Sequence, residues 1–258
     1  MKFAALAVLA LAGNAAAGEF SPKYAPEEKP LAVALKRAPA HIRSAPAPDF
    51  WALMPYYEGM RGPHSASAAS AAMVLNALRQ GFRYSSADEL ITEEALLRAT
   101  AERGWADRLA GEKPAGVDLA AFGALFESSL STYGVSASVR TIPVAGSDAA
   151  AVASVRRILA DNERFDGDFL IALYKQSVFT GDPEGAVGVY APVGAFDAAR
   201  DAVLIFETDR KWYEPYWVSL DTFVQALASL RDAEGRPAGG LTEIRAKEIP
   251  PAPSKRRP

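Results

Sequence analysis

The sequence predicts an α+β fold in which a helical half precedes an antiparallel sheet. Between residues 67 and 162, apolar side chains recur mostly at the spacing of one helix face. From Phe169 onward, short apolar runs are separated by turn residues, as they are in hairpin-connected strands. Because helices and strands occupy largely separate parts of the sequence, the pattern favours α+β over an alternating βαβ arrangement.

Each predicted helix begins at a turn or a polar cap that is followed by apolar residues at helical spacing. The expected helices are residues 67–80 after the Gly62-Pro63 turn, a helix through Leu97 that a Ser86–Glu89 capping box begins, a helix from the Asp118 cap to Gly134, residues 147–162, and a helix through Leu230 that Ser219 caps.

The predicted strands are short and rich in apolar or β-branched residues. They are residues 135–142, 169–175, 187–196 and 202–208. Residues 197–201 form a tight connection, so the last two of these strands are expected to pair in antiparallel fashion.

Both ends of the sequence differ in composition from its middle. Residues 1–17 combine Lys2, a short apolar run and small residues, which predicts a signal peptide cleaved after Ala17 and export to a periplasm or secretion. The apolar run is too short to span a bilayer, so no stable membrane insertion is expected. Residues 18–48 are rich in Pro and Ala and residues 248–258 are Pro-rich and basic, so we expect an extended arm and a tail around a folded domain at 49–247.

Composition excludes several classes of function. The 258 residues include 28 Lys and Arg against 31 Asp and Glu, a net charge of −3 that disfavours nucleic-acid binding. There is no cysteine, which rules out disulfides, thiolate metal sites and a cysteine nucleophile. The only histidines are His41 and His64, too few for a histidine-rich metal centre. We expect no metal and no cofactor.

Two segments resemble a known family. The first is PHSASAASAAMVLNAL at residues 63–78, and the second is GVYAPVG at 188–194, followed by Arg200-Asp201, Arg210 and Trp217-Val218. Together they are similar to the phytochelatin synthases, papain-like cysteine transpeptidases that move a γ-glutamylcysteine unit from one glutathione onto another. The resemblance covers about residues 49–232 and implies a papain-like fold.

The positions that the resemblance assigns to catalysis lack the family's chemistry. Ala66 stands at the position of the nucleophilic cysteine, Val189 at that of the histidine, Glu207 at that of the aspartate and Met60 at that of the oxyanion glutamine. Alanine has no lone pair with which to attack an amide, and valine accepts no proton. Because the loss of one triad member typically costs up to about a millionfold in rate, we expect a pseudoenzyme with no catalytic residue.

Two residues are candidates for substrate binding. Arg210 matches an arginine near the family's acyl site and would contact a glutathione-like carboxylate, with a surface salt bridge as the alternative. Ser67 follows Ala66 at a helix N-terminus, where it either caps the helix or forms a replacement dyad with His64. We expect Glu207 to pair with Arg210 or with solvent.

Three functions remain open at this point. The first is a binding module that holds a γ-glutamyl peptide or a peptide-like ligand in the old cleft. The second is a scaffold that presents the Pro-rich arms or a surface to an exported protein partner. The third is residual glutathione γ-glutamylcysteinyltransferase or amide hydrolase activity through a non-family nucleophile. Heavy-metal activation in the family relies on metal thiolates, and this chain supplies no thiol, so only a substrate could provide one.

Overall fold

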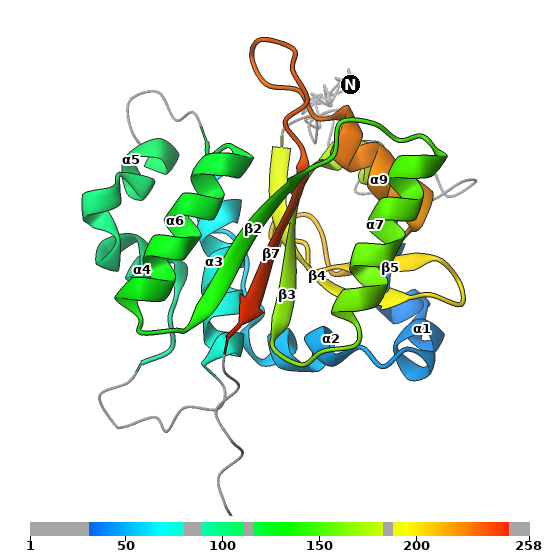
Figure 1. Cartoon of the computed structure of the whole chain (residues 1–258), viewed down its shortest axis with the longest axis horizontal. Coiled ribbons are helices and arrows are strands. Elements are labelled where there is room, and N and C mark those ends of the chain that lie inside the picture. Colours follow the sequence, from blue (N-terminus) through cyan, green and yellow to red (C-terminus); the bar gives the residue numbers. More distant parts are fainter. Residues whose placement is uncertain (1–30, 80–88, 111–115, 183–187, 248–258) are drawn as a thin grey trace, which may run out of the picture.

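The computed structural model describes residues 31–79, 89–110, 116–182 and 188–247 (Figure 1). Within these residues the strands form a seven-stranded sheet in the order β1-β6-β5-β4-β3-β7-β2, and the assigned strand pairs are antiparallel. The strands are β1 Val33–Ala34, β2 Ala137–Pro143, β3 Asp168–Lys175, β4 Gly188–Asp197, β5 Ala202–Ile205, β6 Tyr216–Ser219 and β7 Gly240–Ala246.

Helices gather on both sides of this sheet (Figure 1). On one side α3 packs against β4 and α6 against β2, while on the other α9 packs against β3. The helices are α1 Pro39–Ser44, α2 Pro48–Leu53, α3 Ala66–Leu78, α4 Glu93–Ala99, α5 Trp105–Ala110, α6 Leu119–Thr132, α7 Ala149–Asn162, α8 Gln176–Thr180 and α9 Leu220–Ser229, with 3-10 turns at Leu35–Arg37, Met54–Tyr56 and Ala101–Arg103. The predicted α+β class is confirmed.

Side-chain caps explain where three of the predicted helices begin. The carboxylate of Asp118 accepts the Ala121 N–H at 2.8 Å, and Gly134 follows α6 with a φ of 65°. The hydroxyl of Ser219 accepts the Thr222 N–H at 3.2 Å at the start of α9. Asp148 caps α7 in the same way, so this helix begins at Ala149, close to the predicted start.

The second predicted helix begins later than its sequence pattern indicated. Thr92 caps α4 by accepting the Ala95 N–H at 3.2 Å, so Leu90 and Ile91 lie before the helix. Ile91 is held there because both its backbone groups bond the side-chain amide of Asn76, at 2.7 and 2.9 Å. Ser86 lies outside the described residues.

All four predicted strands are present, but the three strands β1, β6 and β7 were not predicted. β7 pairs with β3 on one side and β2 on the other. β7 was not predicted because its sequence contains charged residues. The Glu243 carboxylate accepts hydrogen bonds from Arg140 on β2 at 2.9 Å and from Arg245 on its own strand at 2.9 Å. These ion pairs allow polar side chains to sit in the middle of the sheet.

Residues 31–48, expected to belong to an extended arm, are folded against the domain instead. Val33 pairs with Trp217 through β1 and β6, and His41 on α1 bonds Asp197 at 2.9 Å. Pro39 and Pro48 each stand in the first turn of a helix, where proline's missing N–H costs nothing. The same prolines that suggested an arm therefore begin helices.

The expected signal peptide at residues 1–17 and the tail at 248–258 lie outside the described residues. In the part of the chain that is described, no helix combines the length and apolar character needed to cross a bilayer.

Candidate functional site

A pocket of about 470 Å³ lies at the N-terminal end of α3. It brings together three of the positions that the resemblance assigned to catalysis: Ala66 on α3, Met60 in the preceding loop and Val189 on β4. The rest of the lining is Pro63, His64, Ser67, Gly116, Val117, Asp118, Leu173, Gly188, Tyr190, Leu230, Arg231, Asp232, Ala233 and Ala238. Aliphatic and aromatic side chains supply most of its wall.

Small side chains let α3 lie close to the sheet beside this pocket. All thirteen residues of α3 are buried, and six of them are alanines. The N–H groups of Ala68 and Ala69 bond the Ser65 carbonyl at 3.0 and 3.1 Å. No acceptor within the described chain pairs with the N–H of Ala66 or Ser67, so the positive end of the helix dipole meets the pocket with two donors free.

Ser67 is not arranged as a nucleophile. Its hydroxyl oxygen accepts the indole N–H of Trp105 at 3.1 Å, and only 1% of the residue is exposed. His64 is exposed at the pocket rim, and among the described residues no hydrogen bond joins it to Ser65 or Ser67. Ser65, rather than Ser67, occupies the N-cap position of α3.

Glu207 lies in the core, and the expectation that it pairs with Arg210 or solvent was wrong. The residue is fully buried, and its carboxylate accepts hydrogen bonds from Tyr174 at 2.8 Å and Tyr216 at 2.7 Å. The Asp209 N–H donates to its other oxygen at 3.0 Å. Burial, and then the Glu207 charge, raise the pKa of both tyrosines well above the ordinary value, so the phenols stay neutral donors.

The register of the sheet connects this network to the pocket. Tyr174 on β3 stands directly opposite Val189 on β4, so the two side chains share one face of the sheet. Tyr174 therefore links the buried Glu207 carboxylate to the strand that carries Val189.

Glu207 also influences a neighbouring carboxyl group. Burial, followed by the negative charge of Glu207, raises the pKa of Asp209 to about 6. Asp209 follows β5 and leads into the turn that carries Arg210.

Arg210 does not line the pocket. Its exposed guanidinium lies 4.5 Å from the ring centroid of Tyr57, a cation–π contact. The Tyr57 hydroxyl donates to the Glu207 carbonyl at 2.6 Å. Gly59 is required beside it, because a Cβ there would approach the Arg210 side chain to 2.6 Å. In this structure Arg210 braces the loop before Met60.

Two carboxylates hold the other side of that loop. Glu93, at the start of α4, accepts the Arg61 N–H at 2.9 Å, and Glu58 accepts the Glu93 N–H at 3.2 Å. Burial raises the pKa of both carboxyl groups. The loop carrying Met60 is therefore fixed from both ends.

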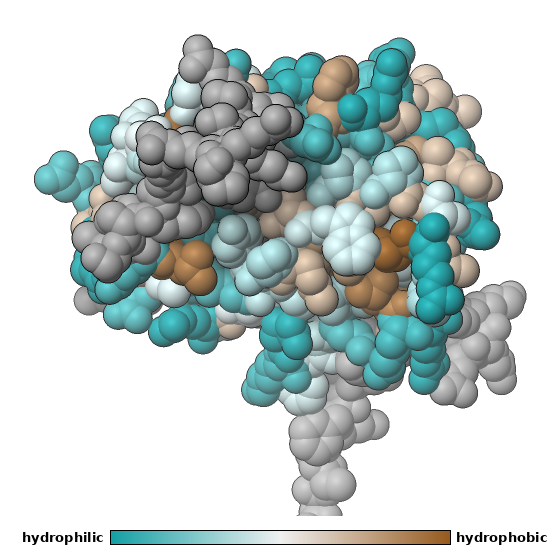
Figure 2. Space-filling model, turned by 90° about the horizontal axis from the view of Figure 1, so that it is seen from below, coloured by the Kyte–Doolittle hydropathy of each residue, from teal (hydrophilic) through white to brown (hydrophobic). Residues whose placement is uncertain are grey.

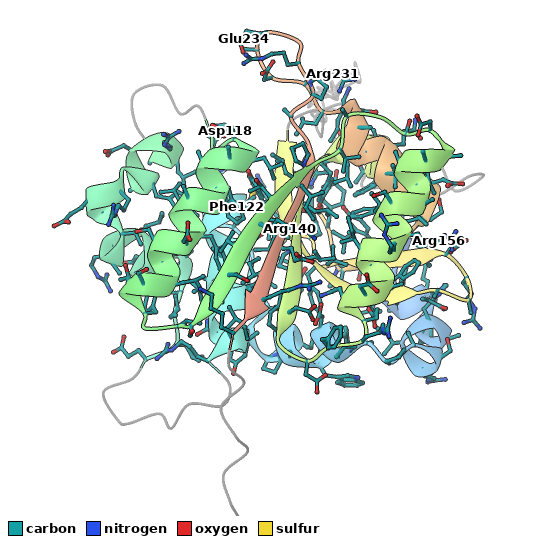
Figure 3. The ribbon with its side chains drawn as sticks, in the orientation of Figure 1. Asp118, Phe122, Arg140, Arg156, Arg231 and Glu234 are labelled. Atoms are coloured by element: carbon teal, nitrogen blue, oxygen red, sulfur yellow. The ribbon has the colours of Figure 1, made fainter. Side chains whose placement is uncertain are left out.

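Charged residues at the pocket rim were not predicted as site residues. Asp118 was expected only to cap a helix, and Arg231 was not singled out at all. Figure 3 shows both at one end of the molecule, with Glu234 farther out on the same loop as Arg231. Arg231 donates to the Leu230 carbonyl at 2.9 Å. No local pattern marks Arg231, because only the tertiary fold brings it to the same pocket as Asp118.

Comparison with known proteins identifies the family. A family model described as phytochelatin synthase matches residues 34–239, well over half of the sequence. The chain belongs to the phytochelatin synthase family. This confirms the resemblance that the two sequence segments carry.

Two curated proteins of Arabidopsis thaliana are similar to a part of this family member. Glutathione gamma-glutamylcysteinyltransferase 1 is 31% identical over 70 residues, which are 27% of this chain and 14% of that protein. Glutathione gamma-glutamylcysteinyltransferase 2 is 31% identical over 74 residues, 29% of this chain and 16% of that protein. The chain thus matches about one seventh of the length of these relatives.

The positions of the described acidic and histidine side chains also bear on metal binding. Among the residues that the structure describes, no group of three or more His, Asp or Glu side chains is placed to hold a metal ion.

Proposed function

We propose that this phytochelatin synthase-family protein binds a γ-glutamyl peptide or a similar peptide-like ligand without turning it over. The observation that carries the proposal is the pocket of about 470 Å³ at the start of α3. Ala66, Val189 and Met60 line this pocket without filling it. If the pocket neither catalysed a reaction nor bound a ligand, larger side chains could fill it at no cost to function.

The absence of reacting groups in the lining supports the pseudoenzyme part of the proposal. Ala66 and Val189 carry neither a nucleophile nor a proton acceptor. Ser67 has a hydroxyl, but that hydroxyl is buried against Trp105. His64 has no hydrogen-bonded nucleophile among the described residues, so it has nothing to activate.

The polar groups of the lining support a zwitterionic ligand. The free N–H groups of Ala66 and Ser67 suit a carbonyl or carboxylate oxygen. Arg231 suits a second carboxylate, and Asp118 suits an ammonium group. A γ-glutamyl peptide carries a free α-carboxylate and a free α-ammonium on one residue and a terminal carboxylate at its other end.

The papain-like arrangement and export from the cytoplasm are parts of the same proposal. The packing of α3 on β4 beside a carboxylate at 207 supports the first. The Lys2, apolar and small-residue pattern of residues 1–17 supports the second.

Isothermal titration of glutathione into the full chain, with and without Cd²⁺, tests the proposal. We expect a saturable heat that decays to baseline after each injection. Arg231→Ala should weaken binding about tenfold, or about 1.4 kcal/mol, because it removes a charge-assisted hydrogen bond. Arg156→Ala is the matched control, since Arg156 pairs with Asp201 and neither residue lines the pocket.

Arg210→Ala tests the assignment made from the resemblance. Because Arg210 lies outside the pocket lining, we expect about a twofold change or less. Flat injections at millimolar glutathione would contradict the binding proposal and favour the scaffold function. Heat flow that persists after each injection would contradict the pseudoenzyme proposal.

A further inference from the structure

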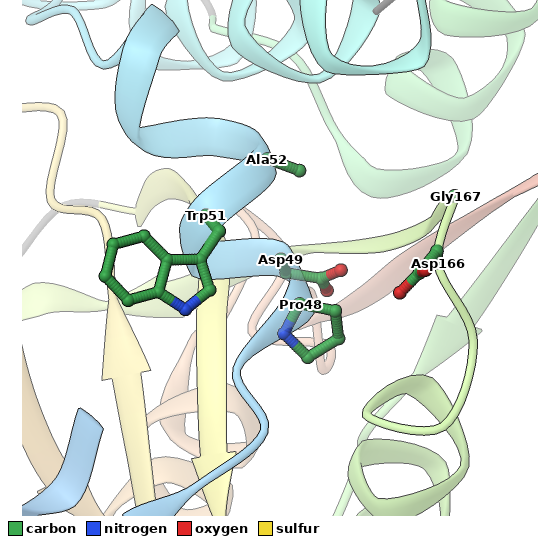
Figure 4. A pocket seen from close by; sticks show the side chains of 6 residues that line it. All are labelled: Pro48, Asp49, Trp51, Ala52, Asp166 and Gly167. Atoms are coloured by element: carbon green, nitrogen blue, oxygen red, sulfur yellow. The ribbon is translucent and has the colours of Figure 1, made fainter. Parts of the chain in front are cut away.

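A second pocket lies on the other side of the domain from Arg231, beside α2. Its volume is about 300 Å³, and it is lined by Pro48, Asp49, Trp51 and Ala52 of α2 and by Asp166 and Gly167. Figure 4 shows the indole of Trp51 at one side, the Asp166 carboxylate at the other, and Pro48 and Asp49 between them. None of these residues belongs to the pocket at α3.

Trp51 gives this pocket an unusual aromatic wall. It is 63% exposed, the most of any exposed large hydrophobic residue in the described chain, and Phe165 next to Asp166 is 57% exposed. Figure 2 shows the molecule from below, with apolar residues exposed among charged ones. The Trp51 indole packs edge-on against Phe50 at 5.0 Å, and no acceptor within the described chain bonds its N–H. The exposed indole therefore presents an apolar face and a hydrogen-bond donor to a segment that lies across the pocket.

The opposite wall of the pocket is acidic. Asp166 is exposed, and within the described residues no cation lies in ion-pair distance of it. Asp49 is almost completely buried, and burial raises the pKa of its carboxyl group well above the usual value. The pocket therefore offers one exposed carboxylate, one buried carboxyl group and one aromatic plane.

The strand that is last in the sequence, β7, ends beside this pocket. The Ala246 N–H at the end of β7 donates to the Gly167 carbonyl at 3.0 Å, and Gly167 is itself part of the lining. The sequence that follows Lys247 is EIPPAPSKRRP, residues 248–258. Residues 250–253 contain three prolines, and Lys255, Arg256 and Arg257 follow.

We infer that residues 249–258 dock into the Trp51–Asp166 pocket of their own chain. Pro250, Pro251 and Pro253 favour a polyproline II helix, the form that aromatic grooves recognise by stacking on proline rings and donating an indole N–H to a carbonyl. The basic residues then lie near Asp166. At about 3.1 Å per residue, the proline stretch reaches across a pocket that begins at Gly167.

Attachment favours this occupant over a Pro-rich segment of another protein. A segment tethered a few residues from its site has an effective concentration in the millimolar range, so a weak contact is enough to hold it. The acidic wall and the basic segment also have complementary charge.

Fluorine NMR of the full chain labelled with 5-fluorotryptophan tests the inference. Trp51→Phe assigns the Trp51 resonance, and Trp212, which is 38% exposed at another site, supplies an internal control. We expect the Trp51 resonance to move when residues 248–258 are deleted, while the Trp212 resonance stays in place. Adding the 249–258 peptide to the deleted chain should return the Trp51 resonance to its original position.

Charge variants distinguish docking of the peptide from a change in the solvent exposure of Trp51. Asp166→Lys should weaken peptide binding about threefold, the range of an exposed ion pair, and Trp51→Ala should weaken it about tenfold or more. A peptide with Lys255→Glu, Arg256→Glu and Arg257→Glu should bind the Asp166→Lys chain better than it binds the parent.

Three results would overturn the inference. One is a Trp51 resonance that is identical with and without residues 248–258. Another is a shift that depends on protein concentration, which would assign the pocket to a second copy of the chain. The third is equal binding of a peptide of residues 19–30, which would show that any Pro-containing segment fits.

Discussion

The pocket at α3 and the Glu207 core both contain positions that the resemblance assigns to catalysis, and they differ in burial and in hydrogen bonding. In the pocket, Ala66, Met60 and Val189 put apolar side chains where the resemblance expects reacting groups. Behind them, position 207 keeps a carboxylate, and that carboxylate is fully buried with three hydrogen bonds. A group at the surface of a cleft can be lost without cost to folding, whereas a buried carboxylate must keep its partners.

The difference assigns separate roles to the two regions. Glu207 bonds Tyr174 and Tyr216 inside the sheet, and ligand binding by the pocket is what we propose. The predictions below test this separation, from the largest expected effect to the smallest.

Glu207→Ala should lower the free energy of unfolding by about 3–5 kcal/mol, because it leaves two buried phenols and the Asp209 N–H without their acceptor. Urea denaturation measures the change. Glu234→Ala, on an exposed loop, is the control and should change stability by less than about 0.5 kcal/mol. A loss below about 1 kcal/mol for Glu207→Ala would mean that the carboxylate is not structural.

Tyr216→Phe should destabilise the protein by about 1.5–3 kcal/mol, the range for a hydrogen bond to a charged group. Tyr174→Phe removes the second donor to the same oxygen. Because both hydroxyls serve one acceptor, the double variant should show a coupling of about 0.5 kcal/mol or more in a double-mutant cycle. Strict additivity would contradict a shared network.

Asp209 should make stability depend on pH between about 4 and 6. Its folded-state pKa of about 6 is raised from 3.8, so the folded protein holds this proton more tightly than the unfolded chain does. The contribution is therefore present below pH 3.8 and is lost as the pH rises to about 6. Relative to the parent, Asp209→Asn should gain about 1–2 kcal/mol above pH 6, after allowing for screening by solvent.

The pH dependence of the difference in unfolding free energy between parent and Asp209→Asn checks this sign. A difference that is constant from pH 4 to 7 would contradict the raised pKa. Glu207→Gln should also lower the Asp209 pKa in a carboxyl NMR titration, because it removes the neighbouring negative charge.

Ser67→Ala should cost about 1 kcal/mol of stability, because the buried Trp105 N–H loses its acceptor. We expect glutathione affinity to change by less than about twofold, since the Ser67 hydroxyl is already engaged. Titration calorimetry and urea denaturation of the same variant separate the two effects. A large loss of affinity with unchanged stability would instead give Ser67 the ligand-binding role that the sequence predicted for it.

Local signals in the sequence were enough for most of the elements. Asp118, Ser219 and Gly134 act on their own helices, so caps and breakers located α6 and α9 without tertiary information. Pro39 and Pro48 contributed to the prediction of an extended arm, but proline occurs both in extended segments and in the first turn of a helix, and here it begins helices. β7 was missed because its polar residues depend on partners in β2 and β3.

The candidate site could be predicted only in part, because some of its residues are brought together by the tertiary fold alone. The resemblance placed Ala66, Val189 and Met60 in one site, and the structure brings them together in one pocket. It could not give the partners of Glu207, because Tyr174 and Tyr216 come from two other strands. Nor could it give Arg231, which lines the same pocket as Asp118 only because of the tertiary fold.

Glycine release from glutathione, in the presence of Cd²⁺, tests the central claim most directly. A protein that binds without turnover should release no glycine above the protein-free rate at any protein concentration, while titration under the same conditions shows saturable binding. Release that increases with protein concentration and disappears in Ser67→Ala would contradict the claim, and it would show that this pocket performs amide chemistry with a nucleophile outside the family pattern.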